Sequence, residues 1–302
     1  MAVFEGVYSA AISPRRGADE IDLGALWNLF DFLGSRPLDG IVLMGSTGEF
    51  VHFGLDERIR MMGLAVKRSR LPLLINVSHS TLDGALQLAH AASDAGAAGL
   101  LLMPPYYFRY RQGELLGFFK GFRDELPDTP PLLLYNIPIF TSALEPATIA
   151  ELIAYGYAGV KDSGSKWEDL EETRRLCGDR DYTFLVGNDR LFARARAAGA
   201  QGVVSGVASA IPELLIALNR SVCSGNAQRA SQLNRHLDEF LDRFDALPIP
   251  MAIREAAAIR GLKTGPSAIR PDAALSKTLD AFRQWFSSWL PEVLKTATSE
   301  RE

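Results

Sequence analysis

The chain has 302 residues, 47% of them hydrophobic and 23% charged, a composition that excludes extensive disorder. Its net charge of −4 argues against nucleic acid or an anionic membrane as its main partner. No apolar run approaches the roughly 18 residues of a membrane-spanning helix, and the two cysteines, Cys177 and Cys223, form no CxxC motif. Because residues 1–5 also lack the features of a secretion signal, we expect a cytoplasmic protein.

A short apolar run followed by a segment with helical periodicity is the pattern that repeats along the chain. The runs do not alternate with polar residues, which is typical of strands buried on both faces of a parallel sheet. Their centres lie about 18 to 35 residues apart, enough for a strand, a helix and two loops in each unit. We predict eight strands, over residues 6–12, 40–44, 71–77, 98–103, 131–135, 158–160, 182–186 and 202–204.

The segments between the predicted strands have helical patterns with recognisable ends. Leu82, Ala85 and Ala89 share one face of a predicted helix that Gly96 would end, and Pro146 stands at a typical first position of another helix. Eight strands that alternate with helices predict a (β/α)8 barrel. The competing fold is a doubly wound open sheet, but the sequence ISPRR after the first strand lacks the glycine fingerprint of that fold.

The strand pattern ends near residue 220, and only helical periodicity follows. We predict three further helices, over residues 228–247, 251–262 and 273–294, and expect the polar end at 296–302 to fray. The chain is therefore predicted to be an α/β protein with two domains. These are a catalytic (β/α)8 barrel over residues 1–222 and a C-terminal helical domain over residues 223–302.

Active sites of (β/α)8 barrels lie at the carboxyl ends of the strands, so the residues after each predicted strand are the candidates for chemistry. Lys161 is the most informative, because it alone among seven lysines follows a predicted strand. Desolvation at a barrel mouth favours the neutral, nucleophilic form of an amine. Such an amine condenses with a keto group to give a Schiff base, which draws electrons from the neighbouring carbon. The alternative is an ion pair of Lys161 with Asp162 or with a helix carboxylate.

Tyr135 and a Gly-Ser-Thr-Gly turn add groups that suit this chemistry. Tyr135 ends the strand before that of Lys161, so its hydroxyl can reach the same site and transfer a proton, unless it is a rim tyrosine with a hydrated hydroxyl. Ser46 and Thr47 offer hydroxyls, and the glycines beside them let backbone amides approach a small carboxylate. The alternative for this turn is a plain connection between a strand and a helix.

The pattern of histidines gives no support for a metal site. The four histidines show no HxH or HExxH spacing, and no carboxylate cluster accompanies them. His79 follows the third strand, but we expect a loop histidine that is hydrogen-bonded to the backbone. We therefore expect no metal and no cofactor, only a covalent lysine imine with the substrate.

Four motifs stand at predicted strand ends: GSTGE at 45–49, PPYY at 104–107, YNIP at 135–138 and GVKDS at 159–163. Together they resemble the dihydrodipicolinate synthase / N-acetylneuraminate lyase family, and the resemblance runs from about residue 5 to residue 295. It implies a class I, Schiff-base enzyme that acts on pyruvate or another 2-keto acid, on a barrel with a C-terminal helical segment. It also implies a homotetramer, built as a dimer of dimers.

The resemblance assigns roles to the residues at matching positions. Lys161 would form the Schiff base and Tyr135 would transfer protons, relayed by Thr47. Tyr107 would complete that relay from the neighbouring subunit. The residues that would bind the keto acid are Ser46, Thr47, Gly48 and Val204.

The chain departs from two members of the family where the aldehyde partner would bind. Synthases of dihydrodipicolinate carry an arginine two residues after the YNxP proline, where this chain has Phe140, which cannot bind an anion by charge. Sialic acid lyases carry an acidic residue where Arg190 follows Asp189. Both activities are therefore disfavoured. The residues expected to bind the rest of the substrate are Ser163, Gly187, Asp189 and Phe140.

We expect a lyase that reversibly cleaves a 2-keto acid, with a 2-keto-3-deoxy sugar acid favoured, to pyruvate and an aldehyde. Ser163, Asp189 and Ser205 suit a polyol, whereas Ile139 and Phe140 suit a less polar, aromatic acceptor, and the sequence leaves this conflict open. The alternatives are a dehydratase that uses the same imine, a dihydrodipicolinate synthase, a non-catalytic keto-acid-binding paralogue, and an unrelated metal or phosphate barrel.

Overall fold

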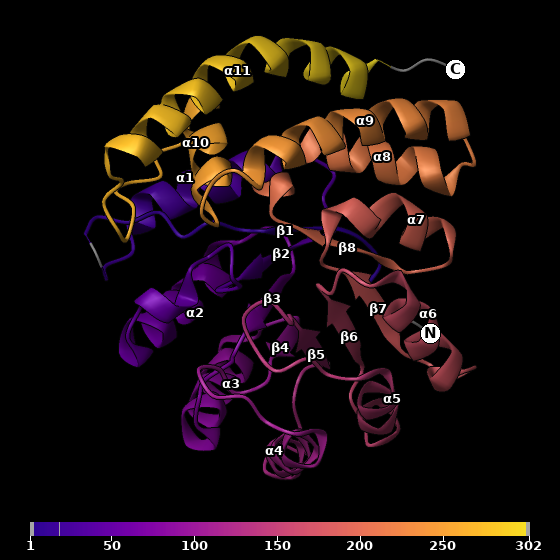
Figure 1. The fold of residues 1–302 in the computed structure, drawn as a ribbon. Helices are drawn as coiled ribbons and strands as arrows, with labels where there is room; N and C mark the ends of the chain where they lie inside the picture. The colour runs from indigo at the N-terminus through magenta and orange to yellow at the C-terminus, as the bar shows by residue number, and fades with distance from the viewer. Residues whose placement is uncertain (1–2, 18, 300–302) are drawn as a thin grey trace.

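The structure, a computed structural model, describes residues 3–17 and 19–299 and is built around a closed barrel (Figure 1). Its eight parallel strands pair in sequence order, and β8 pairs with β1 to close the sheet. The predicted (β/α)8 fold is confirmed. The strands are β1 (Gly6–Ala10), β2 (Gly40–Leu43), β3 (Leu73–Asn76), β4 (Gly99–Leu102), β5 (Leu132–Asn136), β6 (Gly159–Asp162), β7 (Thr183–Val186) and β8 (Gly202–Ser205).

Every residue of these strands is buried, as the unbroken apolar runs predicted. The end of one strand differs from the prediction, and this affects the position of a candidate site residue. The sixth strand was predicted to end at residue 160, but β6 continues through Asp162. Lys161 therefore lies within the strand, because its backbone pairs with Tyr135 on one side and Leu185 on the other.

A helix follows each strand and packs on the outside of the barrel. Two predicted ends are confirmed: Gly96, in the left-handed conformation at φ 88°, ends α3, and Pro146 is the first residue of α5. The helices are α1 (Leu23–Gly34), α2 (Leu55–Arg68), α3 (Leu82–Ala95), α4 (Gln112–Asp124), α5 (Pro146–Ala154), α6 (Trp167–Cys177), α7 (Phe192–Ala197) and α8 (Pro212–Cys223). Three short 3-10 helices lie in the loops: η1 (Phe50–His52), η2 (Asp189–Leu191) and η3 (Val207–Ser209).

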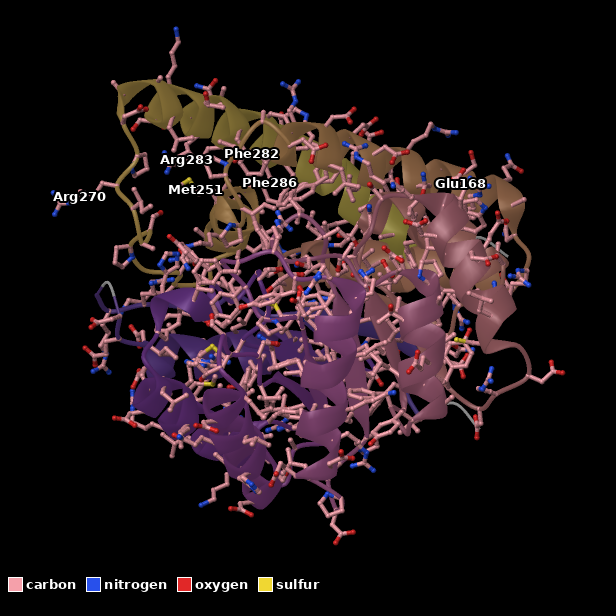
Figure 2. The ribbon with its side chains drawn as sticks, turned by 60° about the horizontal axis from the view of Figure 1, so that its bottom comes forward. Glu168, Met251, Arg270, Phe282, Arg283 and Phe286 are labelled. Atoms are coloured by element: carbon pink, nitrogen blue, oxygen red, sulfur yellow. The ribbon has the colours of Figure 1, made fainter. Side chains whose placement is uncertain are left out.

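Three more helices follow the barrel: α9 (Ala227–Phe244), α10 (Met251–Ile259) and α11 (Ala273–Thr298). They gather on one side of the barrel, and α11 lies across α8, α9 and α10 (Figure 1). Phe282 and Phe286 face inward from α11 (Figure 2), each 6.0 Å from Phe240 of α9 between ring centroids. The three predicted helices are confirmed, and the division at residues 222 and 223 stays a prediction.

The expected fraying at 296–302 is wrong in part, because α11 continues through Thr298, and residues 300–302 lie outside the described part of the chain. The helix continues because Val293, one turn earlier, is fully buried and fixes its last part. Among the described residues, no helix has both the length and the apolar character needed to span a membrane.

Candidate active site

Lys161 and Tyr135 lie side by side at the carboxyl end of the barrel because strand register pairs them. Tyr135 of β5 is the register partner of Lys161 of β6, so both side chains point to the same face of the sheet. Both are buried, and the Nζ atom of Lys161 lies 3.8 Å from the centroid of the Tyr135 ring. The amine is thus held over an aromatic face in a site with little access to bulk water.

Asp162 is not the partner of Lys161, because successive residues of a strand point to opposite faces. Its carboxylate accepts hydrogen bonds from Asn136 Nδ2 at 2.9 Å and from the backbone N–H of Gly164 at 2.6 Å. Burial raises the pKa of Asp162, although these two hydrogen bonds oppose the rise. The Lys161–Asp162 ion pair that the sequence left open is therefore absent from this structure.

The hydroxyl beside Tyr135 belongs to Ser46, which lies in the loop after β2. Ser46 Oγ and the Tyr135 hydroxyl are 3.1 Å apart, and either can donate the hydrogen bond. The resemblance implied that Thr47 relays the protons of Tyr135, but the side chain of Thr47 lies beside Gly206. A Cβ placed on Gly206 after β8 would lie 3.0 Å from Thr47 Oγ1. The structure therefore brings Ser46, and not Thr47, into contact with Tyr135.

A cavity of about 270 Å³ opens around these groups. It lies near the lower end of the size range of small-molecule sites. Of the predicted residues, it is lined by Ser46, Thr47, Tyr135, Phe140, Lys161, Ser163, Gly187, Asp189 and Val204.

Asp189 is one of two acidic residues that line this cavity, the other being Asp245. Its Oδ1 atom is buried and has no hydrogen-bond partner in the part of the chain that the structure describes. Burial raises the pKa of Asp189 to about 6, although a hydrogen bond with Ser205 and the positive charge of Lys161 oppose the rise. A buried carboxyl with a free oxygen in a cavity is suited to accept a hydrogen bond from a ligand hydroxyl.

The sequence matches the dihydrodipicolinate synthetase family over residues 3–283. The chain belongs to this family. A 4-hydroxy-tetrahydrodipicolinate synthase of Methanosphaerula palustris is 28% identical over 295 residues, which cover 93% of this chain and 100% of that protein. The resemblance seen in the four motifs is confirmed, and family members are lyases and aldolases that use a lysine Schiff base.

Two solved structures show how closely the fold agrees. Dihydrodipicolinate synthase from Aquifex aeolicus superimposes with a TM-score of 0.87 at 25% identity, over 95% of this chain and 98% of that one. The 2-keto 3-deoxygluconate aldolase from Picrophilus torridus superimposes with a TM-score of 0.82 at 26% identity, over 87% of this chain and 96% of that one. The chain is thus similar in fold both to a dihydrodipicolinate synthase and to a 2-keto 3-deoxygluconate aldolase.

Gly187 has no side chain, and this leaves the space that Lys161 and Ser163 occupy in the cavity. A Cβ at this position would lie 2.8 Å from Lys161 Cε and 2.1 Å from Ser163 Oγ. Both distances are shorter than real Cβ contacts allow, so any side chain here would displace the lysine and the serine.

Three predicted residues lie outside the cavity around Lys161. Gly48 packs against backbone, where a Cβ would lie 3.1 Å from the carbonyl oxygen of Ala11. Tyr107 is 87% exposed, has a backbone φ of 86°, and lines a neighbouring cavity of about 350 Å³ with Ser46 and Phe140. Ser205, which we expected to offer a contact to a polyol, is buried and does not line the cavity either.

His79 is a loop residue, as expected. Its Nδ1 atom lies 2.9 Å from Thr81 Oγ1 and accepts the backbone N–H of Thr81 at 3.2 Å. Within residues 3–17 and 19–299, no group of three or more His, Cys, Asp or Glu side chains is placed to hold a metal ion.

The C-terminal helices contribute lining residues that the sequence did not reveal. The residues that come from α9, from α10 and from the segment between them are Leu241, Phe244, Asp245, Ile249 and Ile253. In the sequence all of them except Ile249, which lies between two predicted helices, belong to helical patterns. Such patterns indicate a buried face but not the cavity that it faces.

Proposed function

We propose that the chain is a pyruvate-forming Schiff-base lyase that cleaves a 2-keto acid to pyruvate and an aldehyde. The observation that supports this most strongly is the placement of a buried lysine amine, Lys161, over Tyr135 in a cavity at the barrel mouth. Family membership gives the same class of chemistry.

The reaction begins with attack of Lys161 Nζ on the C2 carbonyl of the keto acid. Loss of water gives a protonated imine. Tyr135 accepts the proton of the C4 hydroxyl as its own proton passes to Ser46, which releases one to water. The C3–C4 bond breaks, and the electron pair of that bond moves into the imine to give an enamine. The aldehyde leaves, Tyr135 donates a proton to C3 of the enamine along the same path in reverse, and water hydrolyses the imine to pyruvate and free lysine. No cofactor enters these steps.

The hydroxyl of Ser46 completes the proton path in this proposal. It lies within hydrogen-bond distance of the Tyr135 hydroxyl, so a proton that Tyr135 accepts can pass to it. Ser46 and Thr47 also line the cavity, where they bind the carboxylate of the keto acid together with backbone amides of the loop. Val204 of β8 lines the same cavity.

For the substrate we propose a 2-keto-3-deoxy sugar acid. The groups that follow β6 and β7 are polar, namely Ser163, Asn188 and Asp189. The free Oδ1 of Asp189 can accept a hydrogen bond from a substrate hydroxyl. The similarity to the aldolase of Picrophilus torridus favours the same class.

A second candidate acts on an aldehyde with an aromatic or apolar group. Apart from Asp245, the groups that follow β5 and those from the C-terminal helices are apolar, and they include Ile139, Phe140, Phe244 and Ile249. Phe140 is 45% exposed, so it offers an uncovered aromatic face at the mouth of the cavity. This distribution favours an apolar acceptor in that half of the cavity.

Product analysis tests the function and separates these candidates. The enzyme is incubated with a panel of 2-keto-3-deoxy sugar acids, and separately with pyruvate plus either hydroxylated or aromatic aldehydes. We expect pyruvate and an aldehyde in equal amounts from a sugar acid. A semialdehyde with the carbon chain intact would instead identify a dehydratase, and condensation of aromatic aldehydes alone would favour the second candidate. Binding of keto acids without any product would identify a non-catalytic paralogue.

We further propose that the enzyme is a homotetramer, as the family resemblance implied. Tyr107 and its neighbour Phe108 are 87% and 64% exposed, which is unusual for two adjacent large aromatic residues. A second copy of the chain that covers this face would remove both rings from water. Tyr107 would then reach the active site of that copy and extend its proton path.

A further inference from the structure

A carboxylate between two buried arginines lies behind the loop that carries Ser46 and Thr47. Glu49 Oε1 lies 3.2 Å from a terminal nitrogen of Arg15, and Oε2 lies 3.1 Å from a terminal nitrogen of Arg254. The side chains of Arg15 and Arg254 are 0% and 4% exposed, and that of Glu49 is 10% exposed. Charges so far from water are stable only in a well-defined geometry, and removal of the carboxylate would take from both arginines the ion-pair partner that they share.

These three residues come from three separate segments at the carboxyl end of the barrel. Arg15 lies in the loop after β1, Glu49 in the loop after β2, and Arg254 on α10. Arg254 also donates hydrogen bonds to the carbonyl oxygen of Ser13, at 3.2 Å, and to those of residues 264–266, at 2.7, 3.1 and 2.8 Å. The Glu49 carboxylate therefore joins the loop after β2 to two segments that are themselves connected.

The backbone at Glu49 ties this contact to the catalytic loop. Glu49 has a φ of 51°, a left-handed conformation that a non-glycine residue adopts rarely, and its N–H donates to the carbonyl oxygen of Ser46 at 3.0 Å. The tight turn over residues 46–49 thus places Ser46 opposite Tyr135 and Glu49 between the arginines. Movement at one end of the turn is passed directly to the other.

We propose that Glu49 is a positioning residue: its contacts with Arg15 and Arg254 fix the 46–49 turn and so keep the Ser46 hydroxyl in contact with Tyr135. This inference rests on the proposed function, because it concerns the same proton transfer. Loss of the Glu49 charge lets the arginines repel each other and releases the turn, while Lys161 on β6 keeps its place. Imine formation is therefore retained, and proton transfer at C3 becomes slow.

Exchange of the methyl protons of pyruvate with deuterium, followed by NMR at saturating pyruvate, measures this step without knowledge of the aldehyde. For Glu49→Gln we expect exchange at least about tenfold slower than for the natural protein. Borohydride trapping of pyruvate on Lys161 should remain complete. The melting temperature is measured in parallel.

Glu213→Gln is the matched control. Glu213 is 15% exposed and lies 2.8 Å from both Arg36 and Arg260, so it too is a carboxylate between two arginines. It lies on α8 and does not line the cavity. We expect Glu213→Gln to lower the melting temperature but to exchange pyruvate protons within about twofold of the natural rate.

The proposal is overturned if Glu49→Gln exchanges at the natural rate, or if both variants are slowed equally. Should Glu49→Gln not fold, Glu49→Asp takes its place, since it keeps the charge but is one methylene shorter. Its exchange should be slower than natural, and an unchanged rate would count against the proposal. If the natural protein neither exchanges nor traps pyruvate, the proposed function itself has failed and the role of Glu49 falls with it.

Discussion

Gly187 is the residue at which one added methyl group should do the most damage to catalysis. In Gly187→Ala the new Cβ would lie 2.8 Å from Lys161 Cε and 2.1 Å from Ser163 Oγ, so the lysine must move. We expect the rate of imine formation with pyruvate to fall by at least about tenfold, because a small displacement of a reacting group has a large effect on rate.

The matched control for this change is Gly113→Ala on α4. A Cβ at Gly113 meets nothing within 4 Å, and alanine favours the helix, so stability should rise by about 0.5–1 kcal/mol with activity unchanged. Rates of borohydride trapping measured on both variants decide the point. Natural trapping kinetics in Gly187→Ala would contradict the geometry assigned to Lys161.

Asp189 should make the stability of the protein depend on pH. Its pKa is raised to about 6, above the ordinary value of about 3.9 that it has when unfolded, so between about pH 4 and pH 6 the folded state binds a proton more strongly than the unfolded state. The free energy of unfolding should therefore fall as pH rises through this window. The free-energy cost of burying the ionised Asp189 carboxylate is absent below about pH 4 and fully present above about pH 6.

Asp189→Asn removes this titration. Above pH 6 the variant should be more stable than the natural protein by at most about 3 kcal/mol, and the difference should vanish towards pH 4. Urea denaturation of both proteins from pH 4 to pH 8 measures it. Parallel stability curves across the whole range would show that Asp189 titrates normally.

At the scale of the elements, the chemistry of this site follows from strand register. Parallel strands bring their carboxyl ends to one side, so reading the residues at each predicted strand end found Tyr135, Lys161 and Asp189 from the sequence. The error at the end of β6 did no harm, because moving a strand boundary by two residues does not change which end of the barrel a residue occupies.

In the loop after β2, the sequence does not predict which hydroxyl residue contacts Tyr135. Ser46 and Thr47 are adjacent hydroxyl residues, and nothing in their order tells which of them faces Tyr135. That choice is made by the backbone, where Met44 and Glu49 adopt positive φ values of 57° and 51°. Such conformations are uncommon for these residue types, so residue identity did not signal them.

The C-terminal helices pose a different problem. Phe244 and Ile253 belong to apolar patterns that correctly predicted buried helices. However, periodicity identifies the buried face of a helix and not the element opposite it. The part that α9 and α10 play in the cavity depends on how they pack against the barrel mouth, which is a contact between segments far apart in the chain.

For the whole molecule, the proposed assembly makes a prediction about the face that carries Tyr107 and Phe108. Phe108→Glu places a charge where a second copy would exclude water, so the protein should sediment as a smaller species. Activity should fall in the same sample, because Tyr107 of one copy would no longer reach the other. Ile269→Glu, at an apolar residue that is 72% exposed before α11, is the control.

Sedimentation velocity at several concentrations, with activity measured on the same samples, tests this assembly. We expect dissociation and loss of activity for Phe108→Glu and neither for Ile269→Glu. A natural protein that is monomeric and fully active at all concentrations would refute the role of a second copy.

The proposed chemistry depends on a Schiff base between Lys161 and a 2-keto acid. Intact mass spectrometry after incubation with pyruvate and borohydride detects this bond, on the natural protein and on Lys161→Ala. We expect one reduced pyruvyl group per chain, located on Lys161 by peptide mapping, and none on the variant. An unmodified natural protein in excess pyruvate, or a label on another lysine, would contradict it.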